Sequence, residues 1–391
     1  MTVYTPTYRV TIAGVVQTST TLEDATITYG RNDFFEATQP SYCNLELLNL
    51  DGTSPAVELL DTIILEVTDS TGAFVKLFTG EVSSVHNRFA GAGLGGKPNT
   101  LQIQAIGALG LLVKRYAGSV SYPEELDGAR ITRILEETLF TAWEDLSGTF
   151  TWNDFTTETW ADYGVQGIDT IDVGRYEVLA RPAEIDQAFN LTDTTQQSAL
   201  GYLYDTTDFK IGYADAERRS ENYTTNLIEL DADLVNADIQ TRLQTADIVN
   251  SVVIQYDDPV LEVEAQNDTS INNYGLLQEI RSTILAETAD ATEQATNFVN
   301  YRGTPKTSLE AVSVNLAHSD MTNTVRDDLL AVTMDSLLYL DNIPVGLIPE
   351  GYFEGFVEGW TWTLGRKNLE LTMSVSNSIY STLDVQWEDY N

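Results

Sequence analysis

The sequence has one cysteine and two histidines, which leaves few residues for disulfide, metal or general-base chemistry. The single cysteine, Cys43, excludes a disulfide framework and a cysteine-based zinc site. It lies in a β-favouring stretch, where we expect a small buried strand residue. His86 lies in a predicted strand without a paired acid. His318 is followed by Ser319 and Asp320, but neighbours in one loop cannot form the relay of a catalytic triad.

Basic residues are also scarce. The chain has 21 Lys+Arg against 59 Asp+Glu, a formal net charge of −38. Broad binding to nucleic-acid phosphates depends on Lys and Arg displacing counterions, so the composition excludes an enzyme that grips DNA. The six lysines are Lys76, Lys97, Lys114, Lys210, Lys306 and Lys367.

Long hydrophobic runs are missing. The longest, 106–113, is far short of the roughly 20 residues that a membrane span needs. The first nine residues lack the basic start and apolar core of a signal peptide. We therefore expect a soluble protein, made in a host cytoplasm and without stable membrane insertion.

The residues that are present suffice for folded cores. A hydrophobic content of 42% and an aromatic content of 10% exclude wholesale disorder, and 391 residues fit two or three domains. Residues 1–115 hold 11 acidic and 7 basic residues, and the remainder holds 48 and 14. This asymmetry indicates two surfaces with different neighbours. Adaptation to salty water is an equally open reading of the acidity.

Residues 1–115 have the pattern of an antiparallel β unit. Strands are predicted over 8–16, 26–29, 61–68, 73–79, 81–89 and 101–106, with a turn at 69–72. Gly80 is expected to interrupt a strand at a bulge. Short strands at this spacing favour a sandwich or barrel.

In residues 116–224 the hydrophobic pattern changes from the period of a strand to that of a helix, which predicts an α/β insert. A helical stripe covers 127–141, and Pro182 is expected to open a second helix over 183–200. A β-hairpin follows over 201–213. An aromatic-rich segment, 140–163, separates the first helix from these elements.

Residues 225–391 return to β structure. Strands are predicted over 248–256, 278–285 and 309–316, with a short helix over 289–299. The clearest hairpin covers 360–375 and turns at 365–368. The fold class is therefore mainly β (α+β), with two tube-like antiparallel β-barrel or sandwich units around an α/β insert. We expect Gly80 and the 360–375 hairpin to hold equivalent places in these two units, which requires that they not form one continuous sheet.

No motif predicts a catalytic, cofactor or metal site. Residues 91–96 match G-x-G-x-x-G, but a strand follows instead of the helix that a dinucleotide site needs. The acidic pairs Asp231/Asp233 and Asp257/Asp258 could assist calcium, yet no calcium loop of the usual pattern is present. Tryptophans within 143–160 could stack sugars or form the core of the insert. We expect the protein not to be an enzyme.

Several short pieces resemble, in order, the hub or minor tail-tip proteins of tailed bacteriophages. Each piece is weak alone, but their order is specific. They are Leu77-Phe78-Thr79-Gly80-Glu81-Val82 with 101–113 after it, Arg181-Pro182, Gly201-Tyr202-Leu203-Tyr204, Tyr213-Ala214-Asp215 with Arg218-Arg219, Asn250-Ser251-Val252-Val253-Ile254, Ser270-Ile271-Asn272-Asn273-Tyr274-Gly275 with Pro305, and Val357-Glu358-Gly359-Trp360. The 140–163 segment has no counterpart.

The resemblance implies a structural virion protein at the tail tip. In that family two β units of one chain lie side by side, so three chains form a ring that matches a six-fold tail tube. The implied partners are two further copies, the tail tube or distal tail ring protein, the tape measure protein, and tail fibres or tip proteins. Genomic DNA would pass through transiently, without sequence-specific binding.

Two other functions stay open from the sequence. One is a carbohydrate-active or carbohydrate-binding protein that uses the tryptophan cluster. The other is a distal ring or tube component of the same tail. If DNA passes through a ring of this chain, the lining should be acidic or neutral, with few exposed Lys or Arg, because like charges repel within about 8–10 Å at moderate salt. Salt adaptation predicts acids spread over every solvated face.

Overall fold

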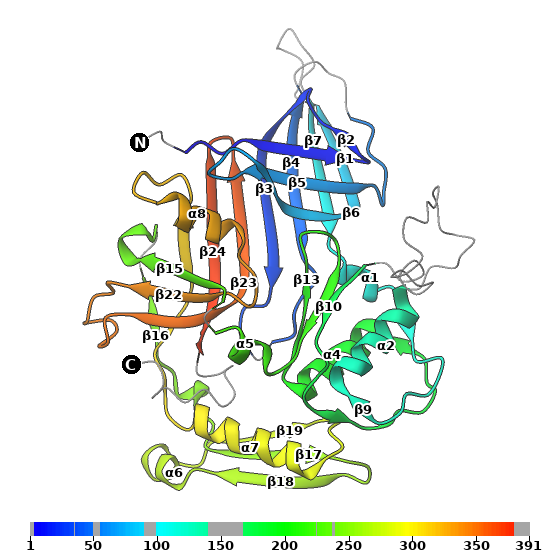
Figure 1. Ribbon diagram of the computed structural model, residues 1–391, viewed down its shortest axis with the longest axis vertical. Helices are drawn as coiled ribbons and strands as arrows, with labels where there is room; N and C mark the ends of the chain where they lie inside the picture. The colour runs from blue at the N-terminus through cyan, green and yellow to red at the C-terminus, as the bar shows by residue number, and fades with distance from the viewer. Residues whose placement is uncertain are drawn as a thin grey trace, which may run out of the picture.

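The computed structural model describes residues 4–34, 36–49, 55–89, 99–139, 167–223, 225–236 and 239–378 (Figure 1). A 12-stranded sheet dominates these residues, in the order β15-β22-β23-β3-β4-β7-β6-β5-β1-β2, with β24 joined to β23 and β21 to β24. Smaller sheets and short helices complete the fold. The mainly β (α+β) prediction is confirmed, although the described part of the large sheet does not close into a barrel.

The first β region contains seven strands. The pairs β1–β2, β5–β6, β3–β4 and β4–β7 are all antiparallel, as predicted for residues 1–115. The bounds are β1 (Tyr8–Ile12), β2 (Val15–Val16), β3 (Thr20–Gly30), β4 (Tyr42–Asn49), β5 (Thr62–Thr68), β6 (Phe74–Phe89) and β7 (Asn99–Ile106).

Strand β6 corrects the prediction at Gly80. The strand runs through this glycine, which pairs with Ile63, and the register shifts lie on either side of it. A Cβ at Gly80 would lie 2.5 Å from the Phe78 ring and 2.6 Å from the carbonyl oxygen of Ile106. Gly80 therefore makes room for an aromatic ring above it and is not itself the bulge.

The second β region contains the predicted C-terminal hairpin. That hairpin is β23 and β24, turning after Gly365 as expected. Helix α8 lies beside β15. The bounds are β15 (Leu227–Asp231), η2 (Ala232–Leu234), β21 (Val312–Asn315), α8 (Asn323–Leu330), β22 (Leu337–Asp341), β23 (Phe353–Gly365) and β24 (Asn368–Asn377).

The two β regions are joined in one continuous sheet, which contradicts the expectation that Gly80 and the 360–375 hairpin hold equivalent places in the two units. Strand β3 pairs with β23 from Asp24↔Gly365 to Gly30↔Gly359. Buried residues of both regions, such as Leu65 and Leu371, belong to one apolar cluster. The physical reason is that β3 and β23 would otherwise each expose a row of unpaired backbone groups.

The insert packs helices α2 and α4 against each other and beside the β13–β14 hairpin. Helix α2 confirms the first predicted helix and β13–β14 the predicted hairpin. Helix α4 begins at Ala188, later than predicted, because Asp186 and Gln187 first pair with β8. Ile185, which precedes this pairing, is 68% exposed. The bounds are α1 (Leu109–Leu112), β8 (Tyr116–Ala117), β9 (Glu125–Leu126), α2 (Asp127–Leu139), β10 (Ile168–Ile171), β11 (Glu177–Val178), β12 (Asp186–Gln187), α4 (Ala188–Ala199), β13 (Tyr202–Asp205), β14 (Ile211–Ala214) and α5 (Arg218–Glu221).

A small α/β layer lies at the other end of the molecule from β1 and β2 (Figure 1). Helix α7 covers a three-stranded sheet, and their buried side chains form a separate cluster that includes Tyr176 of the insert. The bounds are β16 (Thr241–Arg242), η3 (Thr245–Asp247), β17 (Ser251–Tyr256), β18 (Leu261–Gln266), α6 (Asp268–Tyr274), β19 (Gln278–Ser282), α7 (Thr288–Arg302) and β20 (Ser308–Leu309). The division into 1–115, 116–224 and 225–391 stays a prediction. No helix in the described ranges is long and apolar enough to span a membrane.

Candidate functional site

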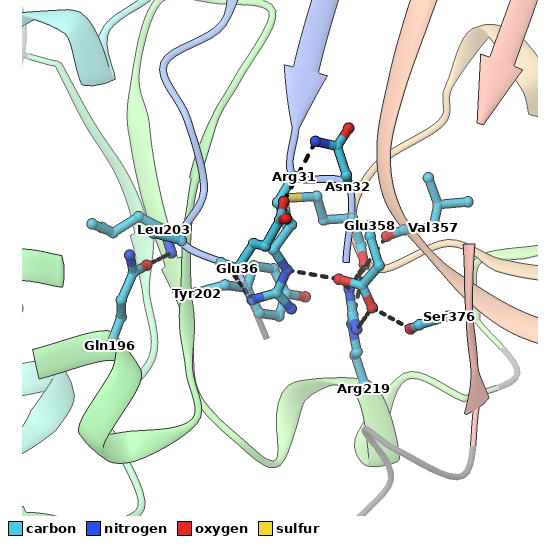
Figure 2. Close-up of polar contacts among 12 residues, drawn as sticks. Arg31, Asn32, Glu36, Gln196, Tyr202, Leu203, Arg219, Val357, Glu358 and Ser376 are labelled. Atoms are coloured by element: carbon cyan, nitrogen blue, oxygen red, sulfur yellow. Dashed lines mark hydrogen bonds and ion pairs between the residues drawn. The ribbon is translucent and has the colours of Figure 1, made fainter. Parts of the chain in front are cut away.

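A buried ion cluster joins the two β regions to the insert. Glu358 of β23 is fully buried and lies between two arginines that come from distant parts of the chain (Figure 2). Arg31, just after β3, donates from Nε to Glu358 at 2.8 Å, and Arg219 of α5 donates from Nη1 at 2.7 Å. The hydroxyl of Ser376 in β24 donates to the same carboxylate. We call these four residues the buried ion cluster.

The backbone around Glu358 explains why a charged side chain points inward. The β23–β24 register shifts between Val357 and Gly359, which leaves Glu358 as an extra residue in the strand. Next to it, β3 and β23 approach at two glycines. A Cβ on Gly30 would lie 2.3 Å from the Glu358 carbonyl oxygen, and one on Gly359 would lie 2.4 Å from that of Arg31. The bulge and the glycine contact together place the carboxylate at the junction.

The electrostatics of the cluster favour the ionised state. Burial by itself would raise the pKa of Glu358, but Arg219 and Arg31 lower it to about 2. Arg219 also donates to the carbonyl oxygens of Met334 and Val357, at 2.9 and 3.2 Å. Removal of one partner would leave the others as buried charges without a counter-ion, which is costly. Such a cluster therefore resists separation of the segments that it joins.

Aromatic rings and a second ion group surround the cluster. The guanidinium carbon of Arg219 lies 4.8 Å from the Tyr202 ring centroid, within cation–π range. The Tyr202 hydroxyl donates to Asp335, which is 3.4 Å from Nη1 of Arg218. Arg218 also pairs with Asp172 of the insert. Three of the sequence pieces that carry the phage-hub resemblance, 201–204, 218–219 and 357–360, thus meet here.

Asp205 makes a second buried junction between the insert and the first β region. It accepts hydrogen bonds from the backbone and hydroxyl of Ser41, both at 2.7 Å, and from the backbone of Leu109 at 2.7 Å. Gly107 is required beside it, because a Cβ there would lie 2.0 Å from the Ser41 hydroxyl oxygen. Burial raises the pKa of Asp205 to about 6, although these hydrogen bonds favour the charged form.

The insert is also fastened to the small α/β layer. Arg175 pairs with Glu217 of the insert and with Glu293 of α7. Backbone groups add to this contact, since Leu179 donates to the carbonyl oxygen of Ile284 at 2.8 Å. The three junctions hold parts of the fold together.

The histidines and the cysteine lie where no catalytic relay forms. Ser319 donates to Asp320, not to His318, and the imidazole of His318 accepts from the backbone of Asp320. His86 lies exposed on β6 opposite Gln102. Cys43 is a buried strand residue, as predicted, and burial raises the pKa of its thiol to about 12.

The acidic candidates also lie apart. Asp231 accepts from the backbone of Asp233 and from the amide of Asn342, and Asp257 accepts from the backbone of Asp258. Among the described residues, the one carboxylate group close enough to hold a metal ion is a different set, with ligand atoms within 4.8 Å: Glu124, Glu177 and Glu287. The G-x-G-x-x-G match at 91–96 and the tryptophan cluster at 143–160 lie outside the described residues.

Sequence reasoning named Arg219 and Glu358 only as parts of short motifs and did not name Arg31 or Asp205 as junction residues. One signal was available. Glu358 interrupts an otherwise apolar stretch next to a glycine, and an acid in a buried strand needs a cation. Nothing local indicated which arginine would meet it.

The fold is similar to that of solved tail proteins. No protein-family model and no curated protein matches the chain. The 43 kDa tail protein of prophage MuSo2 from Shewanella oneidensis is 12% identical, with a TM-score of 0.56 over 96% of this chain and 99% of that chain. The tail protein from Neisseria meningitidis MC58 is also 12% identical, with a TM-score of 0.58 over 97% and 98%.

A further structure links the fold to secretion machinery. The Escherichia coli c3393 protein, described as a component of the type VI secretion system with structural similarity to the T4 tail proteins gp27 and gp5, is 10% identical. Its TM-score is 0.51 over 94% of this chain and 76% of that chain. At these identities the likeness concerns the fold, and the predicted resemblance is confirmed at that level: this chain has the fold of bacteriophage tail proteins.

Proposed function

We propose that the chain is a structural protein of a phage tail tip and forms the hub ring that continues or closes the tail tube. The observation that carries this proposal is the β3–β23 pairing, through which one chain presents two β regions side by side in one sheet. Three copies around an axis supply six such regions, the number needed to match a six-fold tube. The neighbour described as similar to T4 tail proteins supports the same assignment.

The proposed partners follow from that position. Two further copies complete the ring, the tail tube or distal tail ring protein lies on one side, and the tape measure protein ends at it. Tail fibres or tip proteins attach outside, and genomic DNA passes through without sequence-specific binding. We assign no catalytic step to the chain, because the described junctions use their charged groups to join segments.

Copy number tests the proposal. Quantitative mass spectrometry of purified tails should give three copies of this chain per tail, and native mass spectrometry of the full chain should give a trimer. Six copies per tail would support a distal ring or tube subunit instead. The carbohydrate alternative depends on residues 143–160, outside the described ranges, and predicts glycan-dependent quenching of tryptophan fluorescence, which a hub should not show.

A further inference from the structure

A groove lies at the end of the large sheet where β15 is the last strand. Among the described residues β15 pairs on one side only, with β22. The groove has a volume of about 670 Å³ and extends from these two strands to the start of helix α8, which lies beside β15 (Figure 1). Leu230, Leu234 and Val325 give it an apolar part. Its carboxylates are Glu229, Asp231, Asp233, Asp320 and Asp341. We call it the acidic groove.

The acidic groove is much richer in acids than the chain as a whole. Acids are five of its ten lining residues, but only 59 of the 391 residues of the chain. No Lys or Arg of the described ranges forms a salt bridge with any of the five. Other pockets of the described structure include a cation in their lining, such as Lys76, Arg242 or Arg130. The negative charge of this groove is therefore both concentrated and unbalanced.

The strand register sets like charges against each other in the groove. Asp231 of β15 lies directly opposite Asp341 of β22. One pair along, Glu229 lies opposite Tyr339, and Tyr339 lies opposite Glu354 of β23. Like charges directly opposite each other destabilise a sheet. Desolvation raises the pKa of Tyr339, and the nearby carboxylates, Asp341 first, raise it further. A bound cation would relieve this unfavourable arrangement.

A stacked pair of aromatic rings borders the same carboxylates. The ring centroids of Tyr339 and Tyr352 lie 5.4 Å apart, and Tyr352 is 41% exposed. No arginine of the described ranges lies over either ring, whereas Tyr122, Tyr202 and Phe74 each have one. An aromatic face attracts an ammonium or guanidinium group through its ring electrons. Rings and carboxylates together therefore favour a Lys or Arg side chain.

The spacing of the charges favours a peptide over a metal ion. The carboxylate oxygens that come within 4.8 Å of one another in the described structure belong to a different set of glutamates, outside this groove. Glu229 and Asp231 are two residues apart on one strand, a separation of about 7 Å. Alternate side chains of an extended segment have the same separation.

We propose that the acidic groove binds an extended segment of a partner protein that carries Lys or Arg at alternate positions. The segment lies along β15, whose open edge offers unpaired backbone groups. Its cations meet the carboxylates of Glu229, Asp231 and Asp341 and the ring of Tyr339. The partner is a more basic protein and not a further copy, because two chains of net charge −38 repel each other. The inference goes beyond the proposed hub function, since it does not depend on ring formation.

Peptide binding tests the charge of the groove. The probe is a short fluorescein-labelled peptide with Lys at alternate positions, added to the full chain and followed by fluorescence anisotropy. Glu229→Gln with Asp341→Asn should weaken binding about tenfold. The matched control, Glu262→Gln with Glu264→Gln, removes the same charge from exposed positions of β18 and should bind as the wild type does. The same peptide with Glu in place of Lys should not bind.

Substitution of one ring tests the aromatic contact. Tyr339→Ala should weaken binding of the Lys peptide, whereas Tyr339→Phe should keep it, because the ring face and not the hydroxyl attracts the cation. Equal affinities for the groove and control double variants would show that the overall acidity of the chain attracts the peptide, and would overturn the inference. Absence of binding by the wild type at low salt would overturn it as well.

Native mass spectrometry of the same proteins separates this inference from the hub assignment. Both double variants should keep the oligomeric state of the wild type. A loss of self-association in the groove variant alone would identify a second copy as the occupant and overturn the inference. A monomeric wild type that still binds the peptide through the groove would overturn the hub ring and support the inference.

Discussion

Strands β6 and β23 both bend where they change pairing partners, and different side chains pack at the two bends. Each begins in a crossing layer and ends in the shared sheet, since β6 pairs first with β5 and then with β7, and β23 first with β22 and then with β24 and β3. At the bend of β6, Gly80 lies under the Phe78 ring, and Leu77 and Val82 nearby on the strand are buried apolar side chains. At the bend of β23, Glu358 lies buried between two arginines.

The difference reflects what each bend must hold. The β6 bend is closed by neighbours in the same region, and apolar packing suffices because it is non-directional. The β23 bend must bring together β3, α5 and β24, which are far apart in sequence. Charged hydrogen bonds are directional and leave costly buried charges if a partner is misplaced. The buried ion cluster at the β23 bend therefore selects which distant segments meet.

The largest loss of stability is expected from removing the carboxylate of the buried ion cluster. Glu358→Gln removes the charge that pairs with Arg31 and Arg219 and leaves two cations buried, so the free energy of unfolding should fall by about 3–5 kcal/mol. Denaturant unfolding of the full chain measures it. Glu354→Gln, on a partly exposed position of the same strand, is the matched control and should change stability by less than about 1 kcal/mol. Similar losses for both variants would contradict the role of the cluster.

Adding a methyl group at each bend compares the two directly. A Cβ on Gly359 would meet three backbone atoms at 2.4, 2.6 and 2.8 Å, whereas a Cβ on Gly80 would meet one backbone oxygen, that of Ile106 at 2.6 Å, and the Phe78 ring. Because a ring can shift more easily than backbone and Gly359 meets backbone on more sides, Gly359→Ala should cost about 3 kcal/mol and Gly80→Ala about 2 kcal/mol. Gly346→Ala, with open space around it, should be nearly neutral. Thermal unfolding gives the order, and a larger loss at Gly80 would reverse the comparison.

A pH effect is expected at the Asp205 junction. The pKa of Asp205 is raised to about 6 in the folded chain by burial, so its ionised form destabilises the fold above pH 6, and this destabilisation is relieved as the pH falls towards 4. Between pH 7 and pH 5 the wild type should gain about 1 kcal/mol from this group. Asp205→Asn cannot titrate and should lack that gain.

The pH measurement is a difference between two proteins at two pH values. Other carboxylates titrate in both proteins and cancel in the comparison. Asp69→Asn, on an exposed turn where hydrogen bonds lower the pKa, serves as the control and should not remove the gain. A pH dependence identical in Asp205→Asn and wild type would show that Asp205 stays ionised throughout.

The smallest change in stability is expected at an exposed ion pair between the first β region and the insert. Lys76 of β6 pairs with Asp208 in the β13–β14 turn, but the two side chains are 41% and 58% exposed. Solvent screening makes such pairs weak, so Lys76→Ala should change stability by no more than about 0.5 kcal/mol, and less at high salt. A loss near that of Glu358→Gln would show that burial is not what separates the two contacts.

Local patterns predicted many elements of the fold. The apolar stripe of α2, the β13–β14 hairpin and the β23–β24 hairpin were expected close to where they occur, because periodicity and turn residues act over a few positions. The start of α4 was missed, since Asp186 and Gln187 pair with β8, which lies about 70 residues earlier. The strand β17 and helix α7 were expected, but not that they would form a separate layer with their own core.

The sequence by itself determined the classes of chemistry and of structure. The chain has one cysteine, two histidines and a net charge of −38, so few residues suit nucleophilic or metal catalysis or the binding of DNA phosphates. The β-favouring hydrophobic periods predict a mainly β chain. Tertiary structure alone decided that β3 and β23 pair and that Glu358 meets Arg31 and Arg219. The physical reason is distance along the chain: Thr28 and Thr361 touch across 333 residues, and such contacts depend on how whole sheets pack, which no local pattern records.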